Sequence, residues 1–215
     1  MSRMRRLFVI EVIVPPLVPS LSMRRTTEVA SEYSGRVVGR LETERLTLRP
    51  WREEDAEAAL GVYGAAGVAR WLDPAMDLVP DVHAMRLVLQ QWIAEDGRLI
   101  SPAGRWAIVL RQDQRVVGGA TLLPLPPGNE DLEMGWQLDP AVWGRGYAAE
   151  AGRAIAAWAF AEGCDEVVAV ARVTNARAAA TARRIGMQWV GETEKYYGLR
   201  LQVFRLRPTD LDESP

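Results

Sequence analysis

The chain has 215 residues, of which 48% are hydrophobic and 25% are charged, a balance typical of a globular protein with one buried core. Its formal net charge of -2 gives no overall basic bias, which argues against a nucleic-acid-binding protein. A single cysteine, Cys164, and a single histidine, His83, exclude an internal disulfide, a His/Cys metal cluster and a histidine-dependent triad. We therefore expect a cytoplasmic protein that holds no metal.

The first forty residues differ from the rest of the chain. Residues 1–23 combine arginines with an apolar run, but Glu11 and the Pro15-Pro16 pair interrupt that run. A membrane-spanning helix needs about 20 mostly apolar residues, so we predict no membrane insertion. We expect a poorly ordered extension over 1–40, or an over-long reading frame, then one domain over 41–208 and a tail over 209–215.

Regular patterns begin near Leu41. Residues 46–51 alternate like a short strand, and residues 52–64 carry acidic side chains followed by apolar ones at helical spacing. A further turn of helix is predicted at 68–72. The segment 81–96 has apolar residues on one side, which predicts an amphipathic helix.

Three strand-like runs follow, at 105–111, 115–124 and 131–139. The links between them are short and rich in turn residues, which predicts an antiparallel meander. Beyond the glycine-rich turn discussed next, the pattern predicts a helix, a strand, a helix and a last strand, at 148–162, 166–173, 176–185 and 200–207.

A glycine-rich turn, Gly144-Arg145-Gly146, leads directly into the alanine-rich helix. The two glycines let the backbone turn with its N–H groups exposed, and the helix N-terminus adds a partial positive charge. Together these features favour an anion, most often a phosphate. The turn also fits the dinucleotide fingerprint G-x-G-x-x-G/A, but the strand before it alternates and the strand after it has its acidic residues at the wrong end. No Lys-Ser or Lys-Thr follows the glycines, which excludes a P-loop.

Three stretches of the chain together resemble a known family. They are LETERLTLRPW at 41–51, LEMGWQLDPAVWGRGYAAEA at 132–151 and VTNARAAATARRIGMQWVGE at 173–192. In this order they resemble the GNAT superfamily of N-acetyltransferases, specifically its RimJ/RimL-like branch, over roughly residues 41–208. The resemblance implies an α/β fold: a mixed, mostly antiparallel twisted sheet of about six to seven strands, with helices on both faces.

The resemblance also implies acetyl-CoA as cosubstrate. The family motif Q/R-x-x-G-x-G/A, which binds the pyrophosphate through backbone N–H groups, falls on residues 143–148, with tryptophan in place of the usual first residue. In the family the pantetheine arm lies beside the fourth strand. The implied cofactor-binding residues are Trp136, Gln137, Leu138, Trp143, Gly144, Arg145, Gly146, Tyr147, Ala148, Ala149 and Asn175. For Asn175, capping of the following helix is the alternative role.

Acyl transfer to an amine needs a base for the amine and a proton for the leaving thiolate. Glu133 is the candidate base because it lies on the strand beside the expected thioester, although a solvated acid on a strand face is the alternative. Tyr196 is the candidate proton donor, with Tyr197 beside it, and aromatic packing is the alternative for both. Relatives often carry a serine and a tyrosine where this chain has Ala178 and Ala182.

The resemblance places Trp71 and Asp73 in the acceptor site. It also places the acids Glu53, Glu54 and Asp55 there, although a helix first turn explains these without a substrate. We expect a monomer or homodimer that transfers acetyl to a primary amine, on a protein N-terminus or a small molecule, with no nucleic-acid or membrane partner. An acyl-CoA-binding sensor or scaffold with little turnover and, less favoured, an NAD(P)-binding oxidoreductase stay open as alternatives.

Overall fold

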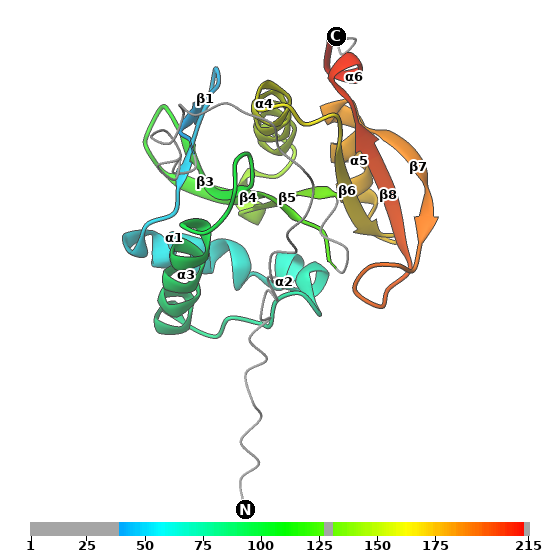
Figure 1. Ribbon diagram of the computed structural model, residues 1–215. Coiled ribbons are helices and arrows are strands. Elements are labelled where there is room, and N and C mark those ends of the chain that lie inside the picture. Colours follow the sequence, from blue (N-terminus) through cyan, green and yellow to red (C-terminus); the bar gives the residue numbers. More distant parts are fainter. Residues whose placement is uncertain (1–38, 127–130, 213–215) are drawn as a thin grey trace, which may run out of the picture. The chain divides into compact units, whose positions relative to one another are not determined.

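An eight-stranded sheet forms the centre of the computed structural model (Figure 1), in the order β1-β2-β3-β4-β5-β6-β8-β7. The structure describes residues 39–126 and 131–212. Most of the predicted extension at 1–40, and residues 213–215 of the tail predicted at 209–215, therefore lie outside the described residues. The rest of that tail belongs to a short helix, Pro208–Asp212. The strands are β1 Leu41–Glu42, β2 Leu46–Pro50, β3 Gly104–Leu110, β4 Val116–Pro124, β5 Leu132–Leu138, β6 Val167–Arg172, β7 Gln188–Thr193 and β8 Leu201–Leu206.

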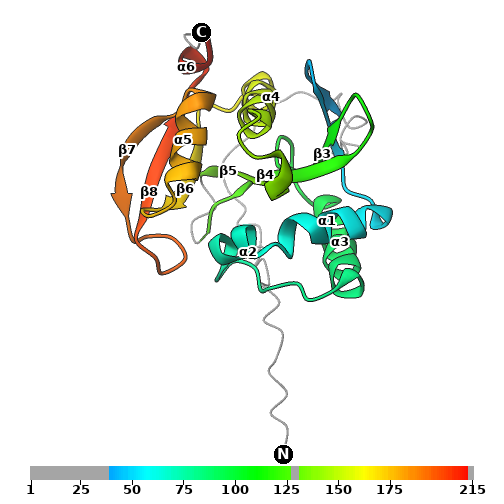
Figure 2. The ribbon, with the colours of Figure 1, turned by 180° about the vertical axis from the view of Figure 1, so that it is seen from behind.

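Helices cover both faces of the sheet, as expected. Figures 1 and 2 show α4 and α5 on one face and α1, α2 and α3 on the other. The α-helices are α1 Ala56–Tyr63, α2 Ala66–Leu72, α3 Val82–Asp96, α4 Tyr147–Ala161, α5 Ala176–Ile185 and α6 Pro208–Asp212. Two 3₁₀ helices, η1 and η2, lie at Glu53–Asp55 and Pro140–Val142.

The predicted meander is confirmed, because β3, β4 and β5 pair as successive antiparallel neighbours. The sheet has more strands than the six to seven expected. The two strands without a prediction are β1, which has only two residues, and β7, an edge strand whose residues are mostly exposed. Neither has the alternation of apolar and polar residues that identifies a half-buried strand in a sequence.

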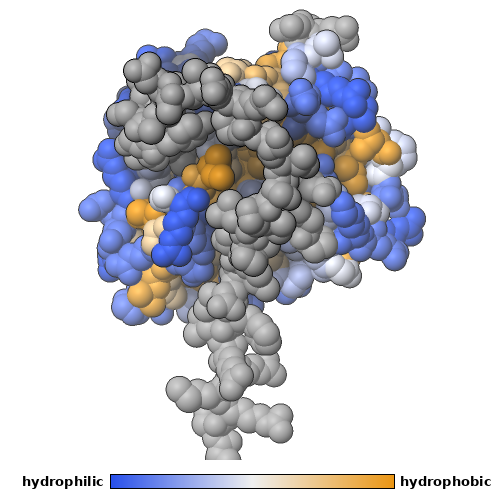
Figure 3. All heavy atoms as spheres, viewed as in Figure 1, coloured by the Kyte–Doolittle hydropathy of each residue, from blue (hydrophilic) through white to orange (hydrophobic). Residues whose placement is uncertain are grey.

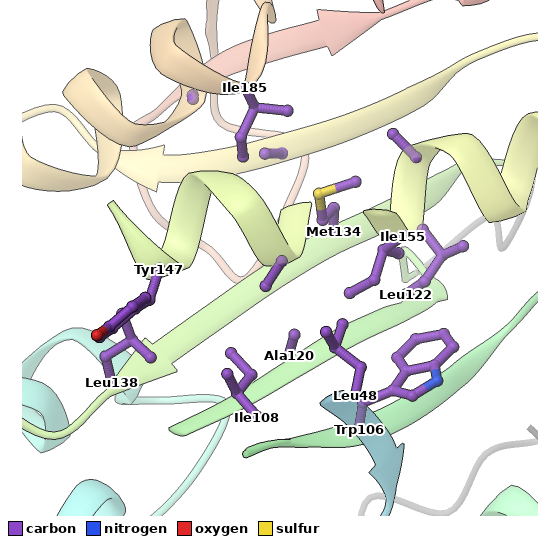
Figure 4. Close-up of a cluster of buried hydrophobic side chains, with 14 of the residues drawn as sticks. Leu48, Trp106, Ile108, Ala120, Leu122, Met134, Leu138, Tyr147, Ile155 and Ile185 are labelled. Carbon is purple, nitrogen blue, oxygen red and sulfur yellow. The ribbon is translucent and has the colours of Figure 1, made fainter. Parts of the chain in front are cut away.

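The core lies mainly between the sheet and α4. Successive residues of β3 point to opposite faces, so Trp106 and Ile108 face α4 while Ala107 and Val109 face α1 and α3. Figure 4 shows the α4 side, where Ile155 of α4 packs among side chains of the central strands. Full burial of one such aliphatic side chain contributes about 1.5–3 kcal/mol, so this layer holds the site's elements in place.

The surface is mixed in character. On the face drawn in Figure 3, hydrophobic residues form separate patches among hydrophilic ones. The large exposed hydrophobic side chains of the described residues are Leu78, Leu87, Ile93, Ile100, Val173, Trp189 and Val190. No helix in the described part of the chain combines the length and the apolar character of a membrane span.

Gly118 of β4 allows a close approach of β5. A Cβ at this position would lie 2.4 Å from the carbonyl oxygen of Gln137, which is a backbone atom and cannot swing away. We expect Gly118→Ala to lower the free energy of unfolding by about 1–3 kcal/mol, as overpacking does. Gly61 provides a matched control within α1, because a Cβ there would meet nothing within 4 Å.

For Gly61→Ala we expect the free energy of unfolding to increase by about 0.5–1 kcal/mol, because alanine has a higher helix propensity than glycine. Urea unfolding of the two variants and the wild type measures both changes. A Gly118→Ala variant as stable as Gly61→Ala would contradict the close strand spacing described here.

Candidate functional site

A cleft of about 840 Å³ opens where β5 and β6 separate. The two strands run parallel, and their one registered pair among the described residues is Glu133 with Val168. Beyond that pair, the β6 side of β5 has no partner strand, so its backbone N–H and C=O groups are available to an extended ligand. The cleft walls come from α2, β5, β6, α5 and the glycine-rich turn before α4.

The glycine-rich turn has the conformation that its sequence suggests. Gly144 and Gly146 have φ angles of 79° and 83°, in the left-handed region where glycine carries no penalty. Gly146 is the N-cap of α4 and offers no side-chain acceptor to the helix. The first N–H groups of any α-helix lack acceptors within the helix. Those of α4 lie beside the cleft, an arrangement suited to an anion.

A charged contact braces this turn from the β1–β2 connection. The Glu150 carboxylate accepts hydrogen bonds from Thr43 Oγ1 at 2.6 Å and from Arg45 Nε at 2.6 Å. Arg45 Nη1 in turn donates to the carbonyl oxygen of Arg145 at 3.0 Å. Burial alone would raise the pKa of Glu150, but these hydrogen bonds hold it below its ordinary value. The sequence carried no signal for this brace, since its partners lie about a hundred residues apart.

A second contact spans the cleft between the turn and α5. Trp143 donates from its indole nitrogen to the carbonyl oxygen of Leu138 at 2.8 Å, and the Arg177 guanidinium lies 4.3 Å from the centre of the Trp143 ring. Asn175 caps α5, because its Oδ1 accepts from the N–H of Ala178 at 3.1 Å. The capping alternative for Asn175 is therefore observed, and the residue also lines the cleft.

Glu133 lies within the cleft and meets Tyr197. The Tyr197 hydroxyl donates to Glu133 Oε2 at 2.8 Å. Burial raises the pKa of the Glu133 carboxyl to about 7, and the hydrogen bond from Tyr197 acts in the opposite direction. Burial and the neighbouring carboxylate raise the pKa of Tyr197. A carboxyl group with a pKa near neutrality is suited to accept a proton at physiological pH.

Tyr196, the predicted proton donor, does not line the cleft. It is 8% exposed, packs with Leu125, Val168 and Leu201, and donates to Asp131 Oδ2 at 3.1 Å. Of the two adjacent tyrosines, the structure brings Tyr197 to the cleft instead.

The two alanines of α5 have different surroundings. Ala178 lines the cleft, whereas Ala182 is 1% exposed and belongs to the core. A hydroxyl is therefore missing from the cleft wall at Ala178.

One side of the cleft, where acceptor-site residues were predicted, is formed by α2 and the residues after it. Trp71 and Asp73 both line this side. Arg172 of β6 donates to the Asp73 carbonyl oxygen and lies 3.3 Å from its carboxylate, a contact that sequence reasoning missed. Figure 1 shows the loop between β7 and β8, which carries Tyr197, on the same side of the sheet as α2.

The three acids at the start of α1 do not line this cleft. Asp55 accepts from Arg49 at 2.7 and 2.8 Å, and Glu53 accepts from Gln90 at 2.8 Å. These contacts fit a structural role for Asp55 and Glu53. Within the described residues, no group of three or more His, Cys, Asp or Glu side chains is placed to hold a metal ion.

Most of the predicted site residues meet in this one cleft. Arg145 and Tyr196 are the exceptions, and the Arg145 side chain is exposed. The predicted residues that line the cleft are Trp71, Asp73, Glu133, Trp136, Gln137, Leu138, Trp143, Gly144, Gly146, Tyr147, Ala148, Ala149 and Asn175.

Comparison with known proteins points to one family. The GNAT acetyltransferase domain model matches residues 45–188. An uncharacterized N-acetyltransferase, p20 of Bacillus licheniformis, is 31% identical over 113 residues, which is 52% of this chain and 60% of that protein's length. The crystal structure of an acetyltransferase from Agrobacterium tumefaciens has a TM-score of 0.64 at 26% identity, covering 86% of this chain and 99% of the other.

A further solved structure has a similar fold. It is RimL, a ribosomal alpha-N-protein acetyltransferase in complex with coenzyme A, with a TM-score of 0.64 at 19% identity. The similarity covers 81% of this chain and 100% of RimL.

Proposed function

Because the chain belongs to the GNAT family of acetyltransferases, we propose that it transfers the acetyl group of acetyl-CoA directly to a primary amine, on a protein N-terminus or on a small molecule. As a member of this family it is an acyltransferase with acetyl-CoA as its cosubstrate. The observation that carries the proposal is that one cleft joins an anion-binding turn to a carboxyl group able to accept a proton near pH 7.

The described residues fit acetyl-CoA in three ways. The left-handed turn and the first N–H groups of α4 suit the pyrophosphate. The unpaired side of β5 suits an extended arm that adds to the sheet like a strand. The cleft volume lies within the range of ordinary small-molecule sites. Of the predicted residues, Trp136, Gln137 and Leu138 form the β5 part of this site.

Glu133 is the proposed base. Its carboxylate removes the proton of the acceptor amine as the nitrogen bonds to the acetyl carbon. Acetyl-CoA supplies the thioester, whose carbon–sulfur bond breaks to leave a thiolate. The Tyr197 hydroxyl is engaged with Glu133, Tyr196 does not line the cleft and Ala178 has no hydroxyl, so we assign protonation of the thiolate to water. The products are an N-acetylated amine and free coenzyme A.

The fold argues against the dinucleotide-binding alternative. A Rossmann unit places its glycine-rich turn after a strand within a parallel sheet. Here β5, the strand before the turn, pairs antiparallel with β4 along its whole length and has one registered pair with β6. The turn is therefore in a different structural context from the dinucleotide fingerprint.

An acceptor screen tests the proposed function. The full chain is incubated with acetyl-CoA and a panel of peptides with free N-termini and small-molecule amines, while free thiol release and the melting temperature are followed. We expect acetyl-CoA, but not NAD(P), to raise the melting temperature, because a ligand of the folded state stabilises it by mass action. We also expect thiol release that depends on the amine. A raised melting temperature with no amine-dependent release would favour the sensor alternative.

A further inference from the structure

The geometry points to Tyr197 as a positioning residue for Glu133: its hydroxyl holds Oε2 of the carboxylate, so that Oε1 is presented to the acceptor amine. This inference rests on the proposed role of Glu133 as the base. It gives the β7–β8 loop a part in catalysis. The sequence alone did not decide which of the two adjacent tyrosines in this loop takes that part.

The contact between these residues joins two distant parts of the chain. Tyr197 Oη donates to Glu133 Oε2 at 2.8 Å across a sequence separation of 64 residues. Both side chains line the cleft. Among the described residues, Glu133 Oε1 accepts no hydrogen bond, while Oε2 is occupied by the tyrosine. A carboxylate held at one oxygen loses rotational freedom, which keeps its second oxygen in one place for proton transfer.

The backbone of the loop supports a specific role for Tyr197. Its φ angle is 56°, in the left-handed region that residues other than glycine rarely adopt, and Gly198 follows with a φ of 64°. Such strain persists only where the surroundings impose it, and it gathers at functional sites. In this loop Tyr196 donates to Asp131, whereas Tyr197 donates to Glu133. The left-handed backbone at Tyr197 and Gly198 thus occurs where the two tyrosine side chains turn to different partners.

Burial and the hydrogen bond from Tyr197 are the two influences that set the pKa of Glu133. Its paired residues on the neighbouring strands, Leu123 of β4 and Val168 of β6, are apolar. The charged residues of other elements that line the cleft are Asp73 after α2, Arg172 on β6, and Arg177 and Arg184 on α5. Burial raises the pKa of Glu133, and the hydrogen bond from Tyr197 lowers it. Removal of that hydroxyl is therefore expected to raise this pKa further.

The test compares Tyr197→Phe with Tyr196→Phe in the full chain. Each variant keeps the ring and the backbone and removes one hydroxyl. With a verified acceptor, we expect Tyr197→Phe to shift the acidic limb of the pH–kcat profile upward by about one pH unit, as loss of a hydrogen bond to a charged group does. Its rate at pH 7 should fall about five-fold and recover at higher pH. Tyr196→Phe should leave the limb where it is.

A direct titration separates this inference from the proposed function. Carbon-13 NMR of the Glu133 carboxyl, assigned with Glu133→Gln, measures its pKa in each variant without any substrate. A higher pKa in Tyr197→Phe, with no change in Tyr196→Phe, supports the inference. An unchanged titration in Tyr197→Phe, or a loss of rate that is equal at every pH, overturns it. Absence of amine-dependent thiol release from the wild type contradicts the proposed function instead.

Discussion

Replacing Gly146 with valine is expected to abolish the rise in melting temperature that acetyl-CoA gives the wild-type chain. Gly146 has a φ of 83° and begins α4, so a β-branched residue there would be strained and would displace the turn. Its Cβ would also lie 3.4 Å from the Arg45 guanidinium that braces the turn. The N–H groups beside the cleft would then no longer converge on an anion.

The size of the lost shift can be stated in advance. A ligand present at 100 times its Kd stabilises the folded state by about 2.7 kcal/mol. For a domain of this size, that corresponds to a shift of roughly 5–10 °C. Thermal unfolding with and without saturating acetyl-CoA measures it in the wild type and in the variant.

Gly163→Val is the matched control for strain. Gly163 follows the C-terminal end of α4 with a φ of 93°, and it does not line the cleft. This variant is expected to melt at a lower temperature than the wild type, as Gly146→Val is, yet to keep the full shift with acetyl-CoA. If both variants keep the shift, the cosubstrate does not bind at the turn.

The elements with strong local patterns were predictable from the sequence. The helix predicted at 81–96 is α3, and Asp81 caps it by accepting from the N–H of Ala84. The meander was predictable because short links can join only antiparallel neighbours, and β3, β4 and β5 do pair in this way. The turn at residues 144–146 was identifiable because glycine is the residue that adopts left-handed conformations without strain.

Contacts between distant segments were not predictable in this way. Glu150 and Arg45 lie 105 residues apart, and each alone reads as an ordinary exposed charge on a surface turn or helix. The order β6-β8-β7 inserts the last strand between two earlier ones, which no local pattern reveals. Only the packing of the whole sheet decides which strand stands at its edge.

The adjacent tyrosines show the same limit on a smaller scale. Side chains alternate along a strand, so neighbouring residues there have predictable directions. Tyr196 and Tyr197 lie in a loop, where the left-handed backbone at Tyr197 and Gly198 breaks that rule. The sequence therefore identified the pair as a candidate, while the structure was needed to show which member reaches Glu133.

Glu133→Gln is the variant for which the largest loss of rate is expected. In the folded wild type, the pKa of the Glu133 carboxyl is about 7, above its ordinary value of 4.5. Between these pH values the unfolded chain therefore releases the carboxyl proton while the folded chain retains it. The stability contribution of Glu133 therefore falls as pH rises through that window. Glutamine has no proton to lose, and we expect the variant to melt no lower than the wild type above pH 7. A loss of rate there cannot then be attributed to unfolding.

On a verified acceptor, kcat of Glu133→Gln is expected to fall by about 10²-fold or more, because an amide cannot accept the proton of the amine. The acetyl-CoA melting shift should stay unchanged, since the anion-binding turn is intact. Wild-type kcat should rise through about pH 7 as the carboxyl ionises, and the variant should lack this rise. Asp131→Asn, which alters a neighbouring acid hydrogen-bonded to Tyr196, should keep both the rate and the pH profile of the wild type.

Nearly full kcat in Glu133→Gln at every pH would mean that solvent deprotonates the amine. That outcome suits an N-terminal α-amine with a pKa of about 8 better than a lysine-like amine with a pKa of about 10. Glu133 would then shape the acceptor pocket without acting as its base.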